Sequence, residues 1–318
     1  MSKTILFILL GILFLQTGCG SKNSPTSTGS PAPTYSYPFQ FNFGDAGTGN
    51  GQFSLVAGIA VSRNTLFVVD AAAGGRVEKF DLNGNFLATF SGSPAFGQPF
   101  GIAVDKNGVV YVVDHTNNII ETFDSNGNPL GNFGAAGTGV GQFEGPWGIA
   151  VDSAAASIYV TEETNNRFQR CSTSGTGCVT IGGTASGSGN GQFWTPTGIA
   201  LDGSGNIYVA DINNSRIQEF NSSLAFVNKF GSAGSGNGKF GTVSFGIGGL
   251  AIDPNGYLLV ADTDNKRIEK FTTGGGFLQS IGAPTGGWTA PRMVATDSSN
   301  DVYVGDETGD FVSKFAPN

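Results

Sequence analysis

Short hydrophobic blocks alternate with polar turns along most of this chain, and the blocks recur in one order. A typical copy reads Gly-Ile-Ala-Val-Asp, a short turn, Tyr-Val-x-Asp, a polar loop and Arg-Ile-x-x-Phe. The copies begin at Gly58, Gly101, Gly148, Gly198, Gly249 and Met293. A period of roughly 45 residues built from short strand-like segments predicts a stacked or radial repeat architecture.

Each copy contains four strand signals. In the copy that begins at Gly101, the segments rich in Val, Ile, Tyr and Phe are residues 101–104, 110–113, 119–123 and 130–133. Asn-Gly turns separate them, because Asn and Gly tolerate positive φ. No segment shows a sustained helical period with caps. Four antiparallel strands per copy, repeated radially, predict the blade of a β-propeller.

The two ends of the chain predict how the ring closes. The last copy stops after its third strand, at residues 310–315, and the phrase that normally forms a fourth strand occurs alone at residues 39–44. A propeller left open would expose unpaired strand edges. We therefore predict an all-β, six-bladed propeller of four-stranded antiparallel blades, closed by an N-terminal strand that completes the last blade.

The repeat resembles the NHL-repeat family. The shared pattern is Gly-x-Gly-Gln-Phe-x-x-Pro-x-Gly-Ile-Ala-Val-Asp followed by Tyr-Val-x-Asp-x-x-Asn-x-Arg-Ile-x-x-Phe, and residues 189–220 carry nearly all of it. The resemblance extends over residues 37–318 and is weakest in the first copy, where Ser62 replaces Asp. It implies a six-bladed propeller but not a particular function, because one fold serves many functions.

The N-terminus predicts export. Lys3 precedes an apolar run at residues 5–15, which is too short to span a bilayer and suits a signal peptide over residues 1–18. Thr17-Gly18-Cys19 resembles a bacterial lipobox, although Gln16 departs from that pattern. We predict a lipid on Cys19, a flexible tether over residues 19–36, a propeller over residues 37–318 and attachment to the membrane of a bacterial cell envelope. The alternative is an ordinary signal peptide in which Cys19 is incidental.

Charge narrows the class of partner. Charged residues make up 13% of the chain, and the net charge is −8 without any basic run. Nucleic-acid binding requires a basic surface, so we expect no nucleic-acid partner. We predict a monomer that binds or scaffolds an envelope protein, a peptide or a glycan.

The two remaining cysteines, Cys171 and Cys178, are predicted to lie on the third and fourth strands of one blade, across a hairpin. An oxidising envelope would favour a disulfide between them. A reactive dithiol is the alternative, but the spacing is not Cys-x-x-Cys.

Candidate binding residues precede the first strand of each copy, at the expected mouth of the central channel. Phe100, Trp147 and Arg292 occupy such positions, and Trp194 and Trp288 lie nearby in sequence. Aromatic faces and a guanidinium suit stacking on sugars or gripping a peptide side chain or carboxylate. Alternatively, the two aromatic residues Phe100 and Trp147 pack against neighbouring loops.

Catalytic and metal signals are sparse. Asp262 and Asp264 are the best calcium candidates, but an acid recurs at this loop in most copies, which favours a role in turns and in pairing with the following arginines. The single histidine, His115, cannot supply the several histidines that NHL-type lyases place on a metal. Six-bladed lactonases with calcium in the channel need carboxylates there, whereas the inner strands here present apolar residues. A calcium-dependent lactonase or lyase-type enzyme is therefore the alternative function, with calcium as the one candidate cofactor.

Overall fold

The structure is a computed structural model that describes residues 36–318, except residues 73, 243–244 and 285. The chain divides into two units, Met1–Pro33 and Thr34–Asn318. The predicted signal peptide, the lipidation site Cys19 and all but the last residue of the tether lie outside the described residues, so they stay predictions.

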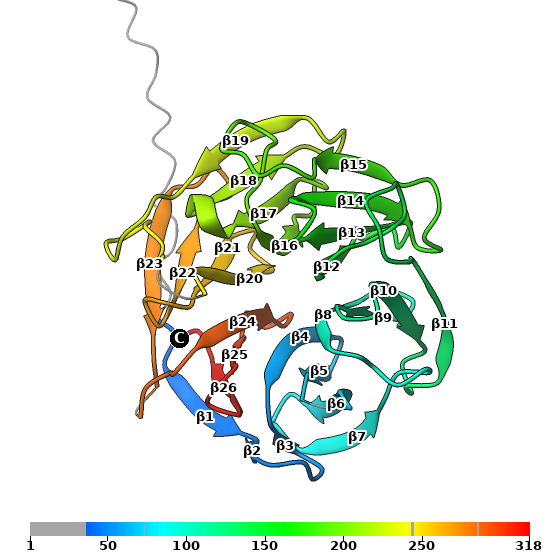
Figure 1. Cartoon of the computed structure of the whole chain (residues 1–318). Helices are drawn as coiled ribbons and strands as arrows, with labels where there is room; N and C mark the ends of the chain where they lie inside the picture. The colour runs from blue at the N-terminus through cyan, green and yellow to red at the C-terminus, as the bar shows by residue number, and fades with distance from the viewer. Residues whose placement is uncertain (1–35, 73, 243–244, 285) are drawn as a thin grey trace, which may run out of the picture. The chain divides into compact units, whose positions relative to one another are not determined.

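In the described residues the strands form six four-stranded antiparallel sheets, the blades (Figure 1). Blade 1 holds β4 (Val56–Ser62), β5 (Thr65–Asp70), β6 (Arg76–Asp81) and β7 (Phe86–Phe90). Blade 2 holds β8 (Pro99–Val104), β9 (Val110–Asp114), β10 (Ile119–Phe123) and β11 (Pro129–Phe133). Blade 3 holds β12 (Pro146–Val151), β13 (Ser157–Glu162), β14 (Arg167–Ser172) and β15 (Val179–Gly182). Blade 4 holds β16 (Pro196–Leu201), β17 (Ile207–Asp211), β18 (Arg216–Phe220) and β19 (Phe226–Phe230). Blade 5 holds β20 (Ile247–Ile252), β21 (Leu258–Asp262), β22 (Arg267–Phe271) and β23 (Phe277–Gly282). Blade 6 holds β24 (Pro291–Thr296), β25 (Val302–Asp306), β26 (Phe311–Phe315) and β1 (Phe39–Phe43).

Two short elements complete the described fold. β2 (Asp45–Ala46) pairs in parallel with β3 (Gln52–Phe53), and η1 (Ile212–Asn214) is a single 3-10 turn. No helix in the described residues is long and apolar enough to cross a membrane.

The N-terminal strand closes the ring, as predicted. β1 pairs antiparallel with β26, and Phe39 lies opposite Phe315. Each first strand contacts the first strand of the next blade, and β24 contacts β4. The segment before β1 is fixed as well, because Lys270 Nζ of blade 5 donates to the Tyr37 hydroxyl at 2.8 Å. The ring therefore joins residues that are more than two hundred positions apart in sequence.

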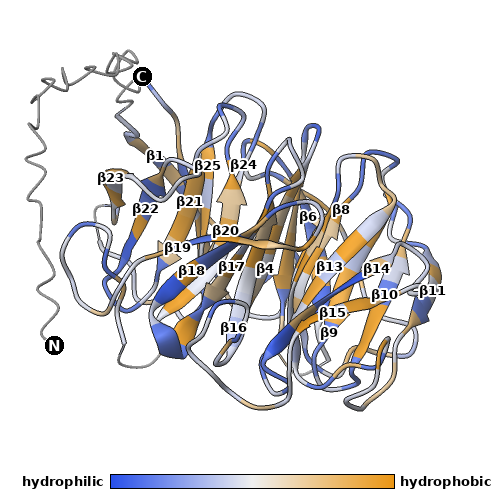
Figure 2. Ribbon diagram, turned by 90° about the horizontal axis from the view of Figure 1, so that it is seen from above, coloured by the Kyte–Doolittle hydropathy of each residue, from blue (hydrophilic) through white to orange (hydrophobic). Residues whose placement is uncertain are grey.

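The hydrophobic core lies between the blades. Strand residues are mostly hydrophobic and the connections at both ends of the blades mostly hydrophilic (Figure 2). The first glycine of the repeat is needed at these contacts: a Cβ on Gly58 would lie 2.2 Å from the carbonyl oxygen of Phe100 in the next blade. Blade 6 has Met293 at this position and Gly305 opposite it in β25, which leaves space for the larger side chain.

An Asp or Glu ends the second strand of each blade, and it binds the connection that leads from the preceding blade into this one. Asp211 accepts the Trp194 N–H at 2.7 Å and pairs with Arg216 at 2.8 Å. Arg216 then donates to the carbonyl oxygens of Ser188, Gly189 and Gln192 in the glycine-rich connection. The same pairing occurs between Glu162 and Arg167 and between Asp262 and Arg267. This confirms the predicted role of the repeated acids in building the loops.

The residue two positions after this arginine varies between Gln and Glu. In blade 4, Gln218 accepts the Gly191 N–H and donates to the carbonyl oxygen of Gln192. In blade 5 the equivalent residue is Glu269, which accepts the Gly238 N–H and lies 3.0 Å from Arg267 Nη2. Burial raises the pKa of the Glu269 carboxyl to about 7 although Arg267 opposes the shift.

Cys171 and Cys178 form the predicted disulfide. Cys171 belongs to β14, and Cys178 lies one residue before β15. The bond spans seven positions in sequence and joins the two outer strands of blade 3. Because disulfides persist in oxidising compartments, it supports a location outside the cytoplasm.

Candidate functional site

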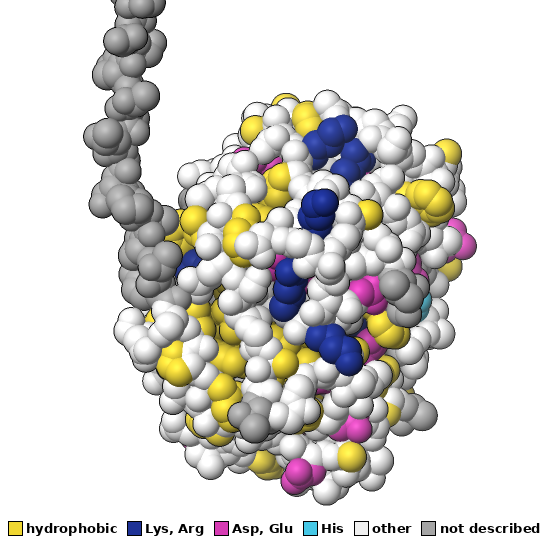
Figure 3. All heavy atoms as spheres, turned by 90° about the vertical axis from the view of Figure 1, so that its left-hand side faces the viewer, with side chains coloured by type: hydrophobic (Ala, Val, Ile, Leu, Met, Phe, Trp, Pro, Cys, Tyr) yellow, Lys and Arg dark blue, Asp and Glu magenta, His cyan; other side chains and the backbone are white. Residues whose placement is uncertain are grey.

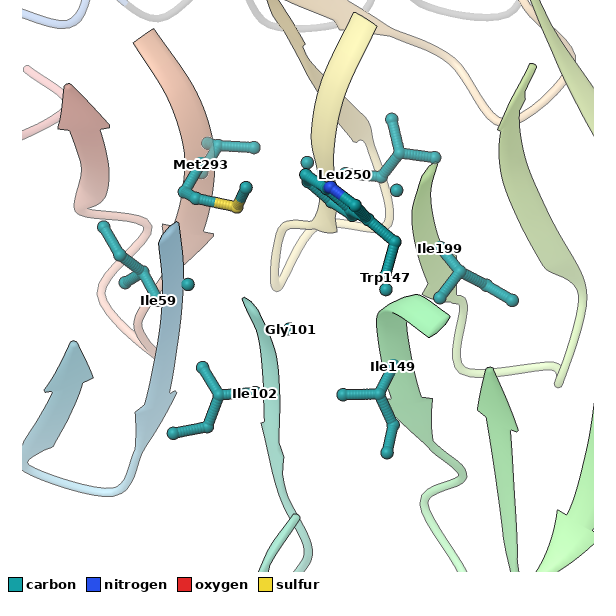
Figure 4. Close-up of a pocket in the computed structure, with 13 residues that line it drawn as sticks. Ile59, Gly101, Ile102, Trp147, Ile149, Ile199, Leu250 and Met293 are labelled. Carbon is teal, nitrogen blue, oxygen red and sulfur yellow. The ribbon is translucent and has the colours of Figure 1, made fainter. Parts of the chain in front are cut away.

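The central channel is narrow and apolar (Figure 4). The inner strands line it with Ile59, Ile102, Ile149, Ile199, Leu250 and Val294. The indole of Trp147 extends toward Leu250, and the remaining cavity is about 50 Å³. A volume of this size holds no more than a few water molecules. The prediction of apolar inner strands is confirmed, and no carboxylate lines this cavity.

Trp147 belongs to a group of contacting side chains at the channel mouth, which we call the mouth cluster. Its members are Phe100, His115, Trp147, Phe245, Arg292 and Glu307. The guanidinium carbon of Arg292 lies 5.1 Å from the Trp147 ring centroid and 4.9 Å from that of Phe245. Phe100 lies 6.0 Å from Trp147 and 4.9 Å from the His115 ring, centroid to centroid. The aromatic rings and the guanidinium thus form one continuous stack.

Arg292 is anchored within this stack. Its Nη1 donates to both carboxylate oxygens of Glu307, at 2.6 and 2.8 Å, and its side chain is only 14% exposed. Buried charges of this kind hold their geometry because separating them leaves a charge without a partner. Arg292 Nε is buried and has no hydrogen-bond partner among the described residues. The ion pair therefore positions the guanidinium against Trp147.

A groove of about 360 Å³ adjoins the mouth cluster and shares Phe245 with it. Its lining residues are Phe245, Thr263, Asp264, Lys266, Thr289, Ala290 and Thr308, from blades 5 and 6. The Phe245 side chain is 37% exposed, and Thr289, Thr308 and Lys266 are exposed. The groove thus combines an aromatic face, hydroxyl groups and an ammonium group, at a volume typical of small-ligand sites.

Positive charge gathers on the side of the ring that carries β19, β23 and β1. Figure 3, which shows the side that carries β19, β23 and β1, displays lysine and arginine side chains in a line. The exposed lysines of blades 4 and 5 and of the loop between them are Lys229, Lys239 and Lys266. This part of the surface thus carries positive charge, although the chain as a whole is acidic.

The predicted binding residues separate into three environments. Phe100, Trp147 and Arg292 meet in the mouth cluster, where the two aromatic residues also pack against their neighbours as the alternative expected. Trp194 lies in the connection before β16, is 50% exposed and takes no part in the cluster. Trp288 is 3% exposed, because its ring packs against Phe315 at 5.5 Å in the core between blades 5 and 6.

Trp288 therefore corrects the sequence interpretation, which placed it near the channel mouth. Its indole N–H donates to the Ser313 hydroxyl at 3.1 Å, so its polar atom is satisfied inside the protein. Sequence reasoning missed Phe245 and Lys266. An unpaired aromatic residue in a long connection was the available signal for Phe245.

The calcium candidates face different partners. Asp262 accepts the Gly241 N–H at 2.9 Å and pairs with Arg267. Asp264 accepts the N–H groups of Phe245 and Gly246, at 3.0 Å each. Both carboxylates thus accept hydrogen bonds from the backbone of the loop before β20, which gives each a structural role. Within residues 36–318, the gaps excepted, no group of three or more His, Cys, Asp or Glu side chains could hold a metal ion.

Comparison with protein families identifies one of the repeats. Residues 193–220, in blade 4, match the NHL repeat. These residues lie in the segment that carries the sequence resemblance most fully, so the assignment to NHL-type propellers is confirmed. No curated protein matches the chain in sequence.

Solved structures share the fold at low sequence identity. A protein of unknown function from Bacteroides thetaiotaomicron is 17% identical, with a TM-score of 0.66 over 85% of this chain and 72% of that one. A gluconolactonase from Xanthomonas campestris is 18% identical, with a TM-score of 0.65 over 85% and 88%. Virginiamycin B lyase from Staphylococcus aureus is 15% identical, with a TM-score of 0.60 over 88% and 99%. At these identities the likeness establishes the fold and leaves the chemistry open.

Proposed function

We propose that this propeller is a recognition module that binds a peptide or a glycan in the groove beside the mouth cluster. The observation that carries the proposal is the exposed Phe245 ring, which lines the groove and stacks on the anchored Arg292. A rigid aromatic face next to hydroxyl and ammonium groups suits a flat sugar face or a polar peptide segment.

Binding fits the surface better than channel catalysis does. The channel is filled by Trp147 and by aliphatic side chains, which leave no room for a substrate. A lactonase of the calcium type would need carboxylates at that position. The enzymatic alternative therefore requires a site elsewhere or a rearrangement of Trp147. It predicts that Ca²⁺ raises the melting temperature and that EGTA lowers it.

We also propose that the protein is exported and held at the bacterial cell envelope by a lipid on Cys19, as a monomer. The Cys171–Cys178 disulfide supports an oxidising location. Membrane fractionation with mass spectrometry of the N-terminal peptide tests the anchor. Acylation should be found on Cys19 and lost in Cys19→Ser, which should release the protein from the membrane fraction.

The binding proposal is tested by screening the full-length protein against immobilised peptides and glycans and measuring each hit by calorimetry. Phe245→Ala and Lys266→Gln should each weaken a true ligand by roughly 10-fold, as expected when a central contact is removed. Val140→Ala is the matched control, because Val140 is 66% exposed on the connection between blades 2 and 3.

Two further variants examine the mouth cluster. Trp147→Ala and Arg292→Ala should weaken binding if the stack orients Phe245, and their melting temperatures show whether the fold survives. Hits that bind Phe245→Ala as tightly as the native protein would refute the assigned site. A screen without hits would remove the proposed function and leave the calcium experiment as the next measurement.

A further inference from the structure

The end of blade 1 remote from the channel mouth differs from that of the other blades. In blades 2 to 6 the residue that follows the first strand is Asp105, Asp152, Asp202, Asp253 or Asp297. This aspartate accepts N–H groups of the following turn; in blade 6 it also accepts the hydroxyl of Tyr303 at 3.1 Å. Blade 1 has Ser62 in place of this aspartate and Phe67 in place of this tyrosine. It therefore lacks both the carboxylate and the phenol.

Blade 1 nevertheless keeps a lysine on its third strand. Lys79 lies opposite Phe67, just as Lys314 lies opposite Tyr303 in blade 6. Lys314 is paired with Asp301 at 2.8 Å. Lys79 instead donates to the carbonyl oxygen of Ser125 at 2.6 Å, and no carboxylate pairs with it in the part of the chain that the structure describes. Its ammonium charge is thus left without a counter-charge.

A second cation lies beside it. Arg63 follows Ser62 and donates through Nη2 to the carbonyl oxygen of Lys106 at 3.3 Å. Both Arg63 and Lys79 thus reach from blade 1 to the turns of blade 2, and each keeps further N–H donors. Together they line a cavity of about 200 Å³.

The rest of this cavity supplies neutral donors. Its polar lining includes Ser62, Thr65, Ser125 and Asn126, and no Asp or Glu lines it. The carboxylates of the two adjoining turns are engaged elsewhere: Asp105 accepts N–H groups of its own turn, and Asp124 accepts those of Asn126 and Asn128. The cavity is therefore locally positive in a chain whose net charge is −8.

We propose that this cavity binds a tetrahedral oxyanion carrying two negative charges, either free phosphate or sulfate or a phosphate monoester on a sugar. Two cations match a dianion, and the guanidinium fork and the hydroxyl groups supply several donors to its oxygens. A water molecule occupies about 30 Å³ in the liquid, so the cavity takes such a group with a few waters. The site lies away from the channel mouth and does not depend on the proposed function.

Calorimetry on the full chain tests the proposal, with inorganic phosphate and inorganic sulfate as probes at constant ionic strength and with acetate as the monovalent comparison. Both dianions should bind more tightly than acetate. Glucose 6-phosphate distinguishes the sources: binding tighter than that of inorganic phosphate identifies a sugar ester, and equal or weaker binding identifies the free ion. Absence of dianion binding at millimolar concentration would overturn the proposal.

Variants locate the site. Lys79→Gln and Arg63→Gln should each weaken dianion binding roughly 10- to 100-fold, the effect of losing one charge-assisted hydrogen bond. Lys229→Gln is the control, because it removes the same charge from an exposed position on β19. An equal loss in Lys229→Gln would show that only net charge matters and would refute the site.

Ser62→Asp gives a test that does not depend on removing a cation. It restores the residue found in the other five blades, places a carboxylate near Lys79 and should abolish dianion binding without lowering the melting temperature. Unchanged binding in Ser62→Asp would contradict the proposed role of the missing aspartate.

Discussion

Glu269→Gln should stabilise the protein at pH 8 and have little effect near pH 4. Glu269 is fully buried: its Oε1 accepts the Gly238 N–H, and its Oε2 has no hydrogen-bond partner among the described residues. Gln218 fills the equivalent place in blade 4 and donates its amide to the carbonyl oxygen of Gln192. A glutamine at 269 can make the same bond to the carbonyl oxygen of Lys239. The substitution therefore replaces a carboxylate that has one unsatisfied oxygen with a group that this fold already uses.

The pH range follows from the raised pKa of Glu269, about 7 against an ordinary value of 4.5. Below pH 4.5 the carboxyl is protonated in both the folded and the unfolded chain, so Glu and Gln behave alike. As the pH rises toward 7 the unfolded chain releases the proton first, which lowers the stability of the native protein but not that of the variant. The difference in pKa corresponds to about 3 kcal/mol at most. Because the raised pKa already includes the attraction to Arg267, we expect a gain of about 1–3 kcal/mol at pH 8.

Urea unfolding followed by tryptophan fluorescence, at several pH values between 4 and 8, measures this difference. The gain from Glu269→Gln should grow between pH 4.5 and 7 and then level off, with a rise in melting temperature of about 2–6 °C at pH 8. Glu144→Gln, at an exposed position, is the control for the change in net charge. A gain that is independent of pH, or a loss at pH 8, would refute the assignment of a buried carboxyl with a raised pKa.

Three further predictions concern closure and packing. Tyr37→Ala should lower the free energy of unfolding by about 2–4 kcal/mol, because buried Lys270 loses the hydroxyl and the ring that it contacts; urea unfolding measures it, and an unchanged midpoint would count against the closing segment. Replacing Cys171 and Cys178 by Ala should cost about 2–3 kcal/mol, seen as a lower melting temperature that equals that of the reduced native protein. Gly231→Ala should lower the melting temperature markedly, since the φ of Gly231 is +95° and the new Cβ would lie 2.3 Å from the buried ring of Phe240. A native-like melting curve for this variant would contradict the packing of Phe240 against Gly231.

Much of the fold follows from local sequence patterns. The predicted strand at residues 119–123 coincides with β10 (Ile119–Phe123), and the segment at residues 39–44 forms β1 in the missing position. Both strand predictions are correct because alternating hydrophobic and polar residues between turns indicate a strand. The repeat also shows the same pattern several times along the chain. The disulfide follows from the same register, since an aligned hairpin brings its two cysteines face to face.

The candidate site was less predictable. Trp147 follows the proline that begins the first strand of blade 3, and it fills the channel mouth. Trp288 lies three residues before Pro291, where other copies of the repeat have a buried phenylalanine such as Phe193, and it packs between two blades. Their environments depend on Arg292 and Phe315, which belong to another blade or to a later strand. Repeat alignment places a backbone position, but it does not say which neighbouring side chain fills the adjacent space.

The sequence by itself determined the number of blades, their strand order, the closing strand and the cysteine pair, because these depend on backbone hydrogen bonding between segments whose periodicity can be read directly. Only the tertiary structure decided that Trp147 closes the channel, that Phe245 opens onto a groove, and that Lys79 and Arg63 share a cavity without a carboxylate. Those features arise where side chains from different blades meet. Their burial and local charge depend on contacts with residues distant in sequence, and a local sequence pattern does not contain that information.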